Sequence, residues 1–309
     1  MSLTDLPDEV LLHIVALALN GATVPSDILR VCRLLHDIGL ECLYTNLRFS
    51  ASTQLYLFSL SPTPALPVAP RSITVDLAGK HAEFHLFGYL RDAFLKCRQQ
   101  CAAAGKLDQS GRVPLRFLCL RMHSYSKDTM LQLFEEALGA ISPEAFEWTG
   151  PDPDHHFSTA IIAPVSARLF KIFGIWSNIR EIKVTNITFA GTGSSQDEKP
   201  LPPLLSDIPS LRMLYIGQAT FLHPQAVAGV LGCGDAMAGL EEFRLVDAYS
   251  ESIWGPRLRR SDVEKAMYGL CGVNDRERAI ARIRRIISCE KKTERIMGGD
   301  RVEGTNVLD

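Results

Sequence analysis

The sequence lacks a strong excess of either charge, and it lacks any long apolar run. Its 33 lysines and arginines are matched by 35 aspartates and glutamates, which gives a formal net charge of -2. This balance argues against binding to nucleic acid or to an acidic membrane surface through charge alone. No apolar run reaches the ~18 residues of a membrane-spanning helix, and Val10–Leu19 follows acidic residues where a signal peptide has basic ones. We therefore expect a protein of the cytoplasm or the nucleus, with no membrane partner.

Cysteine pairs of the CxxC type are also absent. The eight cysteines are scattered through apolar patterns, which predicts free thiols buried as small hydrophobic side chains. They are Cys32, Cys42, Cys97, Cys101, Cys119, Cys233, Cys271 and Cys289. With 46% hydrophobic residues, the 309-residue chain can bury one large core or two smaller ones.

Recognisable catalytic motifs are missing as well. The sequence has neither a GxSxG motif nor a glycine-rich loop followed by Lys-Ser or Lys-Thr. His81 and His85 have a spacing that binds zinc on a helix, but Cys97 would lie about 18 Å further along that helix and on another face. We predict no metal, no cofactor and no chemistry by the chain itself. The enzyme alternative is a hydrolase on an α/β domain, which a His–carboxylate pair with perturbed pKa values, clustered in the structure, would favour.

The first fifty residues follow helical patterns. Pro7 suits the first position of a helix, and apolar residues at spacings of three and four form one stripe as far as Ala18. Asn20-Gly21 ends that helix, a second pattern begins near Pro25, and a short third segment covers 41–47. Three short helices bury little surface alone, so their apolar faces need a neighbour in this chain or in another protein.

Part of this segment follows a family pattern, in Leu6-Pro7-Asp8-Glu9-Val10-Leu11, Ile14, Val31-Cys32-Arg33 and Leu43-Tyr44. Residues 3–48 thereby resemble an F-box, of the divergent kind common in fungal proteins. The resemblance implies binding to a Skp-type adaptor, which links such a protein to a cullin–RING ubiquitin ligase. By match to the family, the adaptor-binding residues are Leu6, Pro7, Val10, Leu11, Ile14, Val31 and Cys32. The alternative is a helical cap on the following domain, which would bury residues that an F-box leaves at least partly exposed.

The rest of the chain contains an irregular repeat with apolar residues at offsets 0, 3 and 5. Six copies begin at Pro70, Leu115, Pro143, Ile179, Leu211 and Leu240. Offsets 3 and 5 are two residues apart, as a strand with one buried face requires, and helical patterns fill most of the gaps. A strand followed by a helix at intervals of roughly 30 residues is typical of a parallel solenoid.

This repeat resembles leucine-rich repeats over about residues 66–270. Offset 8, where that family favours Asn or Cys, holds other residues here, so we expect an irregular α/β array without a side-chain ladder along its turns. The alternative is an ordinary doubly wound α/β domain, which has the same alternation of strand and helix.

Offsets 4 and 6 of each predicted strand face outward on the open side of the sheet. Their mixture of charges, hydroxyls and one aromatic ring suits a protein or peptide target. The predicted target-binding residues are Arg121, Lys183, Tyr215 and Arg244. The three cations among them are the first places to look for contacts to a phosphorylated target.

These patterns divide the chain into five parts. They are a helical unit over 1–50, a proline-rich linker over 51–69, a leucine-rich-repeat-like domain over 70–272, a basic amphipathic helix over 273–297 and a disordered tail over 298–309. The basic helix is expected to cap the solenoid, with an acidic partner or nucleic acid as the alternative.

Together the patterns lead to one hypothesis and one rival. The hypothesis is a non-catalytic F-box subunit that binds the adaptor, and through it a cullin, by its N-terminal helices and an unknown protein target by its repeats. The rival is a solenoid interaction scaffold with no link to ubiquitin.

Overall fold

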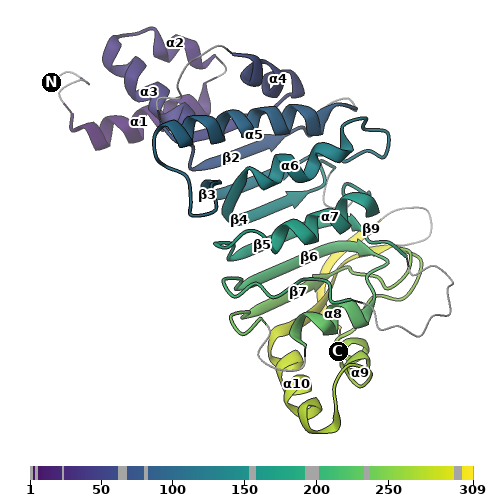
Figure 1. Cartoon of the computed structure of the whole chain (residues 1–309). Helices are drawn as coiled ribbons and strands as arrows, with labels where there is room; N and C mark the ends of the chain where they lie inside the picture. Colours follow the sequence, from purple (N-terminus) through teal and green to yellow (C-terminus); the bar gives the residue numbers. More distant parts are fainter. Residues whose placement is uncertain are drawn as a thin grey trace.

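The computed structural model describes residues 3, 6–22, 24–61, 68–79, 83–152, 158–191, 202–232, 237–295 and 301–308. Nine strands form one sheet, and their order in space is their order in the sequence (Figure 1). Strands β1 to β8 are parallel, and β9 runs antiparallel to β8. A doubly wound sheet reverses its strand order at a switch point, and this sheet does not reverse. The predicted α/β class and the repeated alternation of strand and helix are confirmed.

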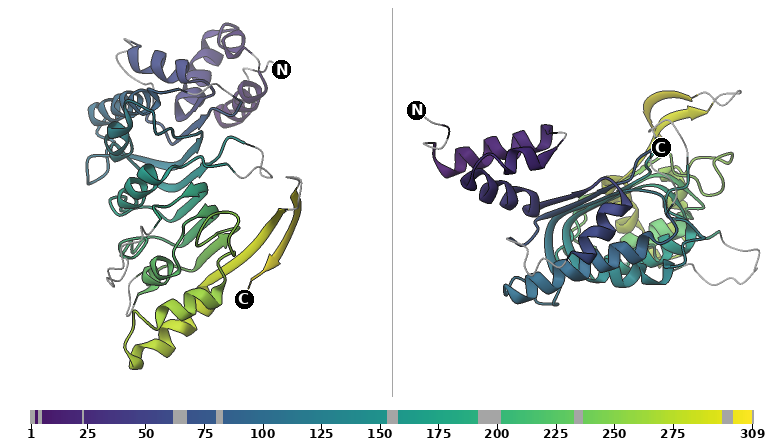
Figure 2. Two further views of the ribbon diagram at one scale, coloured as in Figure 1. Left: turned by 90° about the vertical axis from the view of Figure 1, so that its right-hand side faces the viewer. Right: turned by 90° about the horizontal axis from the view of Figure 1, so that it is seen from above.

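The helices that connect the strands lie on one side of the sheet (Figure 2). The strands are β1 Asn46–Phe49, β2 Ser72–Asp76, β3 Val113–Arg121, β4 Ile141–Thr149, β5 Glu181–Thr188, β6 Met213–Thr220, β7 Glu242–Val246, β8 Ile287–Arg295 and β9 Arg301–Val307. The helices are α1 Asp8–Gly21, α2 Pro25–Leu29, α3 Arg33–Thr45, α4 Ser52–Leu60, α5 Leu86–Ala103, α6 Phe134–Gly139, α7 Ala163–Phe173, α8 Pro224–Leu231, α9 Arg260–Met267 and α10 Val273–Ile286, with the short 3-10 helix η2 Leu131–Leu133.

The six predicted repeat copies coincide with strands β2 to β7. Their offset-3 residues lie side by side in the sheet and are buried, in a row made of Ile73, Leu118, Phe146, Ile182, Leu214 and Phe243. The offset-5 residues form a second buried row of Val75, Leu120, Trp148, Val184, Ile216 and Leu245. The alternation of buried and outward residues fixes this lateral register, because a slip of one residue would expose a whole row.

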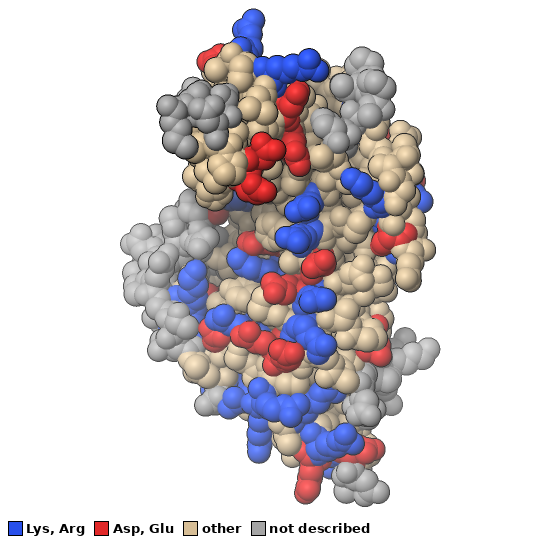
Figure 3. Space-filling view, turned by 90° about the vertical axis from the view of Figure 1, so that its left-hand side faces the viewer, with Lys and Arg blue, Asp and Glu red and all other residues tan. Residues whose placement is uncertain are grey.

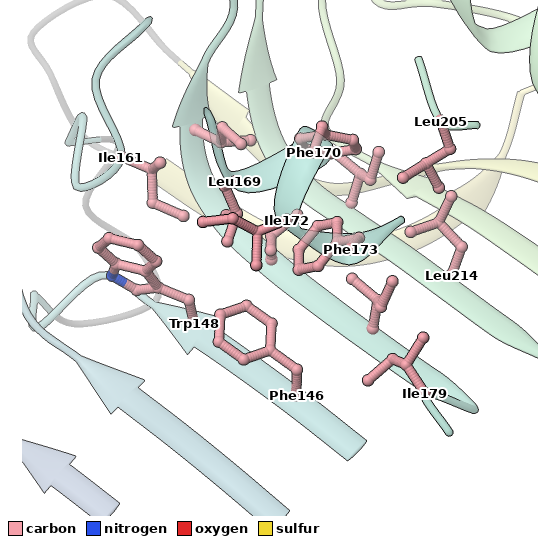
Figure 4. Close-up of a cluster of buried hydrophobic side chains, with 14 of the residues drawn as sticks. Phe146, Trp148, Ile161, Leu169, Phe170, Ile172, Phe173, Ile179, Leu205 and Leu214 are labelled. Atoms are coloured by element: carbon pink, nitrogen blue, oxygen red, sulfur yellow. The ribbon is translucent and has the colours of Figure 1, made fainter. Parts of the chain in front are cut away.

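Aromatic side chains fill the middle of the core between α7 and strands β4 to β6 (Figure 4). The ring of Phe146 lies 5.4 Å from that of Phe173 and 5.3 Å from that of Trp176. The indole N–H of Trp148 donates to the carbonyl of Met122, and that of Trp176 donates to the carbonyl of Leu138. Both buried donors are therefore satisfied, and the rings contribute their full hydrophobic area.

A left-handed backbone conformation, and not a side-chain ladder, repeats along the turns one position before offset 8. Asn186, Gln218 and Asp247 occupy offset 7 of successive repeats and have φ angles of 58°, 46° and 51°. Non-glycine residues in this left-handed region are uncommon, and Asn and Asp are the best tolerated. The backbone carbonyl of Asn186 accepts hydrogen bonds from the N–H groups of Ala160 and Ile161. A left-handed turn thus repeats where three adjacent strands end.

The predicted 1–50 unit ends earlier than expected, because β1 follows α3 directly and pairs with β2. The second predicted helical pattern is divided between α2 and α3, and the segment 41–47 is the end of α3 and the start of β1. Helices α1 to α3 share a small separate core made of Val15, Leu19 and Leu35.

The predicted linker 51–69 contains helix α4, whose end is held by the neighbouring α5. The buried ammonium group of Lys96 donates to the carbonyls of Phe58 and Ser61 at 2.7 and 2.8 Å, and it satisfies acceptors that a helix end leaves free. The prediction of an extended spacer is therefore wrong for Ser52–Leu60, and residues 62–67 lie outside the described part.

The C-terminal predictions also need correction. The basic helix ends at Ile286, and its expected continuation is β8, in which Ile287 and Cys289 extend the two buried rows. The tail predicted to be disordered contains β9 at Arg301–Val307. The two strands form a hairpin at the end of the sheet.

The cysteine prediction, free and buried thiols, is confirmed for Cys97, Cys101 and Cys289, whereas Cys32 is exposed and Cys42 and Cys119 are half-buried. Cys32, Cys42, Cys97, Cys101, Cys119 and Cys289 are not in disulfide bonds. Cys271 is disulfide-bonded, so the expectation of free thiols throughout is wrong. Among the described residues, none of the helices has the length and apolarity to cross a membrane.

Candidate interaction surfaces

Helix α1 carries an apolar stripe on its outer side. At about 100° per residue, Val10, Ile14 and Leu17 lie within about 60° of one another around the helix. Val10 is 44% exposed, Leu17 is 60% exposed, and Ile14 is half-buried. We call these three residues the outer stripe. An exposed apolar surface of this kind is typical of a protein-binding site.

The single stripe predicted from the sequence is in fact two. Leu11, Val15 and Leu19 lie about a quarter to half a turn away from the outer stripe and are buried. Leu11 is 0% exposed, so its assignment as an adaptor-binding residue is wrong: it packs inside the chain and presents no surface to a partner.

The other predicted adaptor-binding residues reach the surface. Pro7, Val31 and Cys32 are exposed, and Leu6 is half-buried. Val31 lies between α2 and α3 with 68% of its surface exposed. Seven of the sixteen exposed large hydrophobic side chains in the described part fall within residues 3–34. The N-terminal unit therefore carries a disproportionate share of the apolar surface.

The predicted target-binding residues lie on the open face of the sheet, and three of them form one cluster. The ammonium of Lys183 and the guanidinium of Arg244 both contact the ring of Tyr215, at 5.9 and 5.6 Å from its centre. The residues come from β5, β6 and β7 at paired positions. Cation–π contacts of this kind hold the two cations on either side of the ring.

Both cations of this cluster also have carboxylate partners. Lys183 donates to Glu147 at 2.8 Å, and Arg244 makes a two-bonded contact to Glu290 at 2.9 and 2.8 Å. These hydrogen bonds raise the pKa of Arg244 and lower the pKa of Glu290. The sequence does not indicate Glu290 as part of this cluster, because the pattern around it predicts a helix and not the strand β8.

Arg121 lies apart from the cluster. Its guanidinium is 4.0 Å from the carboxylate of Asp76 on the neighbouring strand, and Arg48 is 3.9 Å from the same carboxylate. Because all three predicted target-binding cations lie within 4.0 Å of a carboxylate, a phosphorylated target would have to displace an existing pair. The geometry therefore disfavours a dedicated phosphate site on this face.

The charges are also mixed on the side of the molecule that carries the strand starts. Figure 3 shows Lys and Arg interleaved with Asp and Glu along this side. The exposed offset-1 residues of β2 to β7 follow this pattern in the order Arg71, Arg116, Glu144, Arg180, Arg212 and Glu241. Lateral pairing is possible where neighbours differ in charge, as in the 3.7 Å contact of Arg212 with Glu241, whereas Arg180 and Arg212 are neighbours of like charge.

One His–carboxylate pair bears on the hydrolase alternative. His123 lies 3.2 Å from Asp152 beside a small pocket of about 120 Å³, which Tyr125 and Glu83 also line. Nucleophilic catalysis needs a hydroxyl or thiol within hydrogen-bond reach of such a histidine. Among the hydrogen bonds of the described residues, His123 has no serine, threonine or cysteine partner. The pair as it stands therefore lacks the covalent nucleophile of a Ser–His or Cys–His arrangement.

The histidines and cysteines considered as zinc ligands do not form a common site. His85 precedes α5 and contacts the hydroxyl of Thr129 at 2.9 Å, whereas Cys97 and Cys101 are buried in the core. His81 lies outside the described residues, and within the described part no three potential ligands cluster around a possible metal position.

Two of the five arginines of α10 bind neighbouring segments of the chain. Arg282 donates to the carbonyls of Leu231 and Met237, and Arg284 makes a two-bonded contact to Glu264 at 3.0 and 2.8 Å. These contacts tie α10 to the end of α8 and to α9, and α10 leads into β8, so it is a connecting helix within the array and not the predicted cap at its end.

Comparison with protein-family models, with curated proteins and with solved structures finds no match to this chain. The two surfaces are therefore interpreted from their own geometry: an apolar outer stripe on α1, and a paired, charged cluster on the open face of the sheet.

Proposed function

We propose that this chain is a non-catalytic recruiting subunit of a cullin–RING ubiquitin ligase. Its N-terminal helices bind a Skp-type adaptor, and its sheet face binds a protein target that the adaptor then holds near the ubiquitin-loading subunits. The observation that carries the proposal is the outer stripe. It lies within the residues that resemble an F-box and is left open to a partner.

The burial pattern favours adaptor binding over the helical-cap alternative. A cap would bury the residues that face its own domain, but Pro7 and Val10 are exposed and Ile14 is only half-buried. The core of α1 to α3 uses the opposite residues of α1, so the outer stripe has no role in that core. Leaving large aliphatic side chains in water is unfavourable, at about 25 cal/mol per Å² of apolar surface, and burial by a partner recovers this free energy.

The target is expected to contact the cluster of Lys183, Tyr215 and Arg244. The tyrosine ring is held by two cations, so it offers a rigid aromatic surface with little rotational entropy to lose. Because both cations already pair with carboxylates on the same face, we expect the target to contact this cluster through hydrogen bonds and complementary shape, and not through charge alone.

The proposal is tested by co-purification with a purified Skp-type adaptor. The test variant changes the outer stripe to polar residues, as Val10→Ser, Ile14→Ser and Leu17→Ser. The matched control is Leu57→Ser with Leu60→Ser on α4, because these two side chains are 63% and 60% exposed but lie outside the N-terminal unit. Circular dichroism checks that both variants keep the fold.

The native chain and the α4 control should both bind the adaptor, and the outer-stripe variant should not. Failure of the native chain to bind would refute the ubiquitin proposal and leave the rival, a solenoid interaction scaffold. Equal loss in both variants would mean that the contact is non-specific and apolar, which also contradicts the proposal.

A further inference from the structure

A large groove separates the N-terminal helices from the first strands of the sheet. Its volume is about 1280 Å³, above the roughly 300–1,000 Å³ of pockets for small ligands. Its apolar wall comes from Leu12, Ala16 and Leu19 of α1 and from Leu43 and Leu47 around the α3–β1 junction. Size and lining together suit a peptide segment better than a small molecule.

The rim of the groove is basic. Arg48, Arg71 and Lys106 line it, with Glu41 as the acidic residue among the lining side chains. Arg71 and Lys106 are exposed and form no ion pair within the described part of the chain, while Arg48 has only the 3.9 Å contact to Asp76. The charge of the rim is therefore complementary to a segment that carries carboxylates.

One side of the groove is a sheet edge. Strand β1 is the outermost strand of the sheet. The carbonyl of Thr45 accepts from the N–H of Arg71, so it faces β2. Because backbone groups alternate in direction along a strand, those of Asn46 and Arg48 face away from β2. The N–H of Asn46 is bound to Cys42, and that of Ser50 to the side chain of Gln54 at 2.7 Å.

Within the described part of the chain, the hydrogen bonds above leave three backbone groups of this edge for a partner: the N–H and carbonyl of Arg48 and the carbonyl of Asn46. An unpaired strand edge of this kind accepts another extended chain, whose side chains then alternate between two faces. We infer that the groove binds an extended peptide segment of a partner protein, in which apolar residues alternate with acidic ones. The segment pairs with Arg48, places its apolar residues against α1 and its carboxylates against the rim.

This site is independent of adaptor binding, because it uses the other side of α1. Leu12, Ala16 and Leu19 lie about a third to half a turn away from Val10 and Leu17 of the outer stripe. A partner on the outer stripe and a peptide in the groove can therefore be bound together. The inference survives even when the adaptor proposal fails.

The probe is a fluorescein-labelled decapeptide that alternates Asp or Glu with Val or Ile, titrated into the full-length chain by fluorescence anisotropy. One comparison peptide replaces every acidic residue with Lys. A second keeps the acidic residues but carries N-methyl groups on one edge, so that it cannot pair as a strand. We expect the acidic peptide to bind, and both comparison peptides to bind at least about tenfold more weakly.

Two chain variants locate the peptide. Arg71→Glu with Lys106→Glu reverses the charge of the rim at exposed positions, and it should weaken the acidic peptide by at least about tenfold while circular dichroism stays unchanged. Leu17→Ser, on the outer stripe, is the matched control and should leave peptide binding intact.

Several results would overturn the inference. They are no binding of the acidic peptide, equal binding of the Lys peptide, or no effect of the reversed rim. Analytical ultracentrifugation tests whether a second copy of this chain, and not a peptide of another protein, fills the groove. A native dimer that Leu12→Glu converts to monomer would mean that a second copy of the chain fills the groove.

Discussion

Removal of the buried carboxylate of Asp247 should release the C-terminal hairpin from the solenoid. Asp247 is 1% exposed and accepts hydrogen bonds from the backbone N–H and the hydroxyl of Thr293, both at 2.9 Å, and from Arg257 at 2.9 Å. These contacts join the end of β7 to β8 and to the segment after β7. Breaking a buried ion pair by removing one partner costs about 3–5 kcal/mol. Because a fifth of the Arg257 side chain is exposed, we expect Asp247→Ala to cost about 3 kcal/mol.

Hydrogen–deuterium exchange measures this cost locally, as the opening free energy of the amides of β8. In a solenoid each repeat contacts only its neighbours, so the amides of β3 should be unaffected and serve as the internal control. Asp247→Asn keeps one oxygen acceptor but replaces the other with an NH2 donor, which faces either Arg257 or Thr293, so it should cost about 1–3 kcal/mol. Asp247→Gly loses the same contacts as Ala but relieves the φ angle of 51°, so it should be about 1 kcal/mol less damaging than Ala. A loss below 1 kcal/mol at β8 in Asp247→Ala, or an equal loss at β3, would refute this account.

Three further outcomes follow from burial and charge. Trp148→Ala should lower the free energy of unfolding by about 3–5 kcal/mol in urea denaturation, because it empties the centre of the core; a loss below 1 kcal/mol would contradict the packing. The pKa of Glu290 is lowered mainly by its hydrogen bonds to Arg244. The ion pair therefore stabilises the fold fully above pH 4.5, the ordinary pKa, and this stabilisation is lost as the pH falls through the lowered pKa. The acid-induced drop in opening free energy at β8 should therefore be smaller in Glu290→Gln. Burial, aided by the neighbouring Cys101, raises the pKa of Cys97 to about 12. Iodoacetamide at pH 8 should thus modify exposed Cys32 in the native chain and Cys97 only after unfolding, as read by peptide mass spectrometry.

The sequence was sufficient to place six strands in their correct lateral register. Residues such as Ile182 and Val184 are two apart, they are apolar, and their outward neighbours are polar, so only one face could be buried. The same reasoning did not identify β1, because four residues that follow a helix directly are too short to show an alternation. It misassigned β8 because the isoleucines of α10 run into Ile287 without a break, and the basic residues of both segments looked continuous.

The residue types in the turns do not predict the repeated left-handed backbone conformation. Asn186, Gln218 and Asp247 share no single residue type, and what they share is a backbone angle. The buried position of Asp247 depends on Thr293, 46 residues further along the chain, and on Arg257. Local patterns do not encode such partners, so the turn residues were seen as ordinary polar positions.

The two candidate surfaces differ in how much function they imply. The cations on the open face already have an intramolecular explanation, because Lys183–Glu147 and Arg244–Glu290 join neighbouring or nearby strands and stabilise their register. A charged residue with such a partner would be retained in the chain even without any target. The outer stripe of α1 has no comparable explanation: exposure of Val10 and Leu17 costs free energy, and neither residue belongs to the described core of the N-terminal unit. A binding partner removes that cost, so the apolar helix face is the stronger reason to expect a second protein, and the adaptor experiment should precede any search for a target.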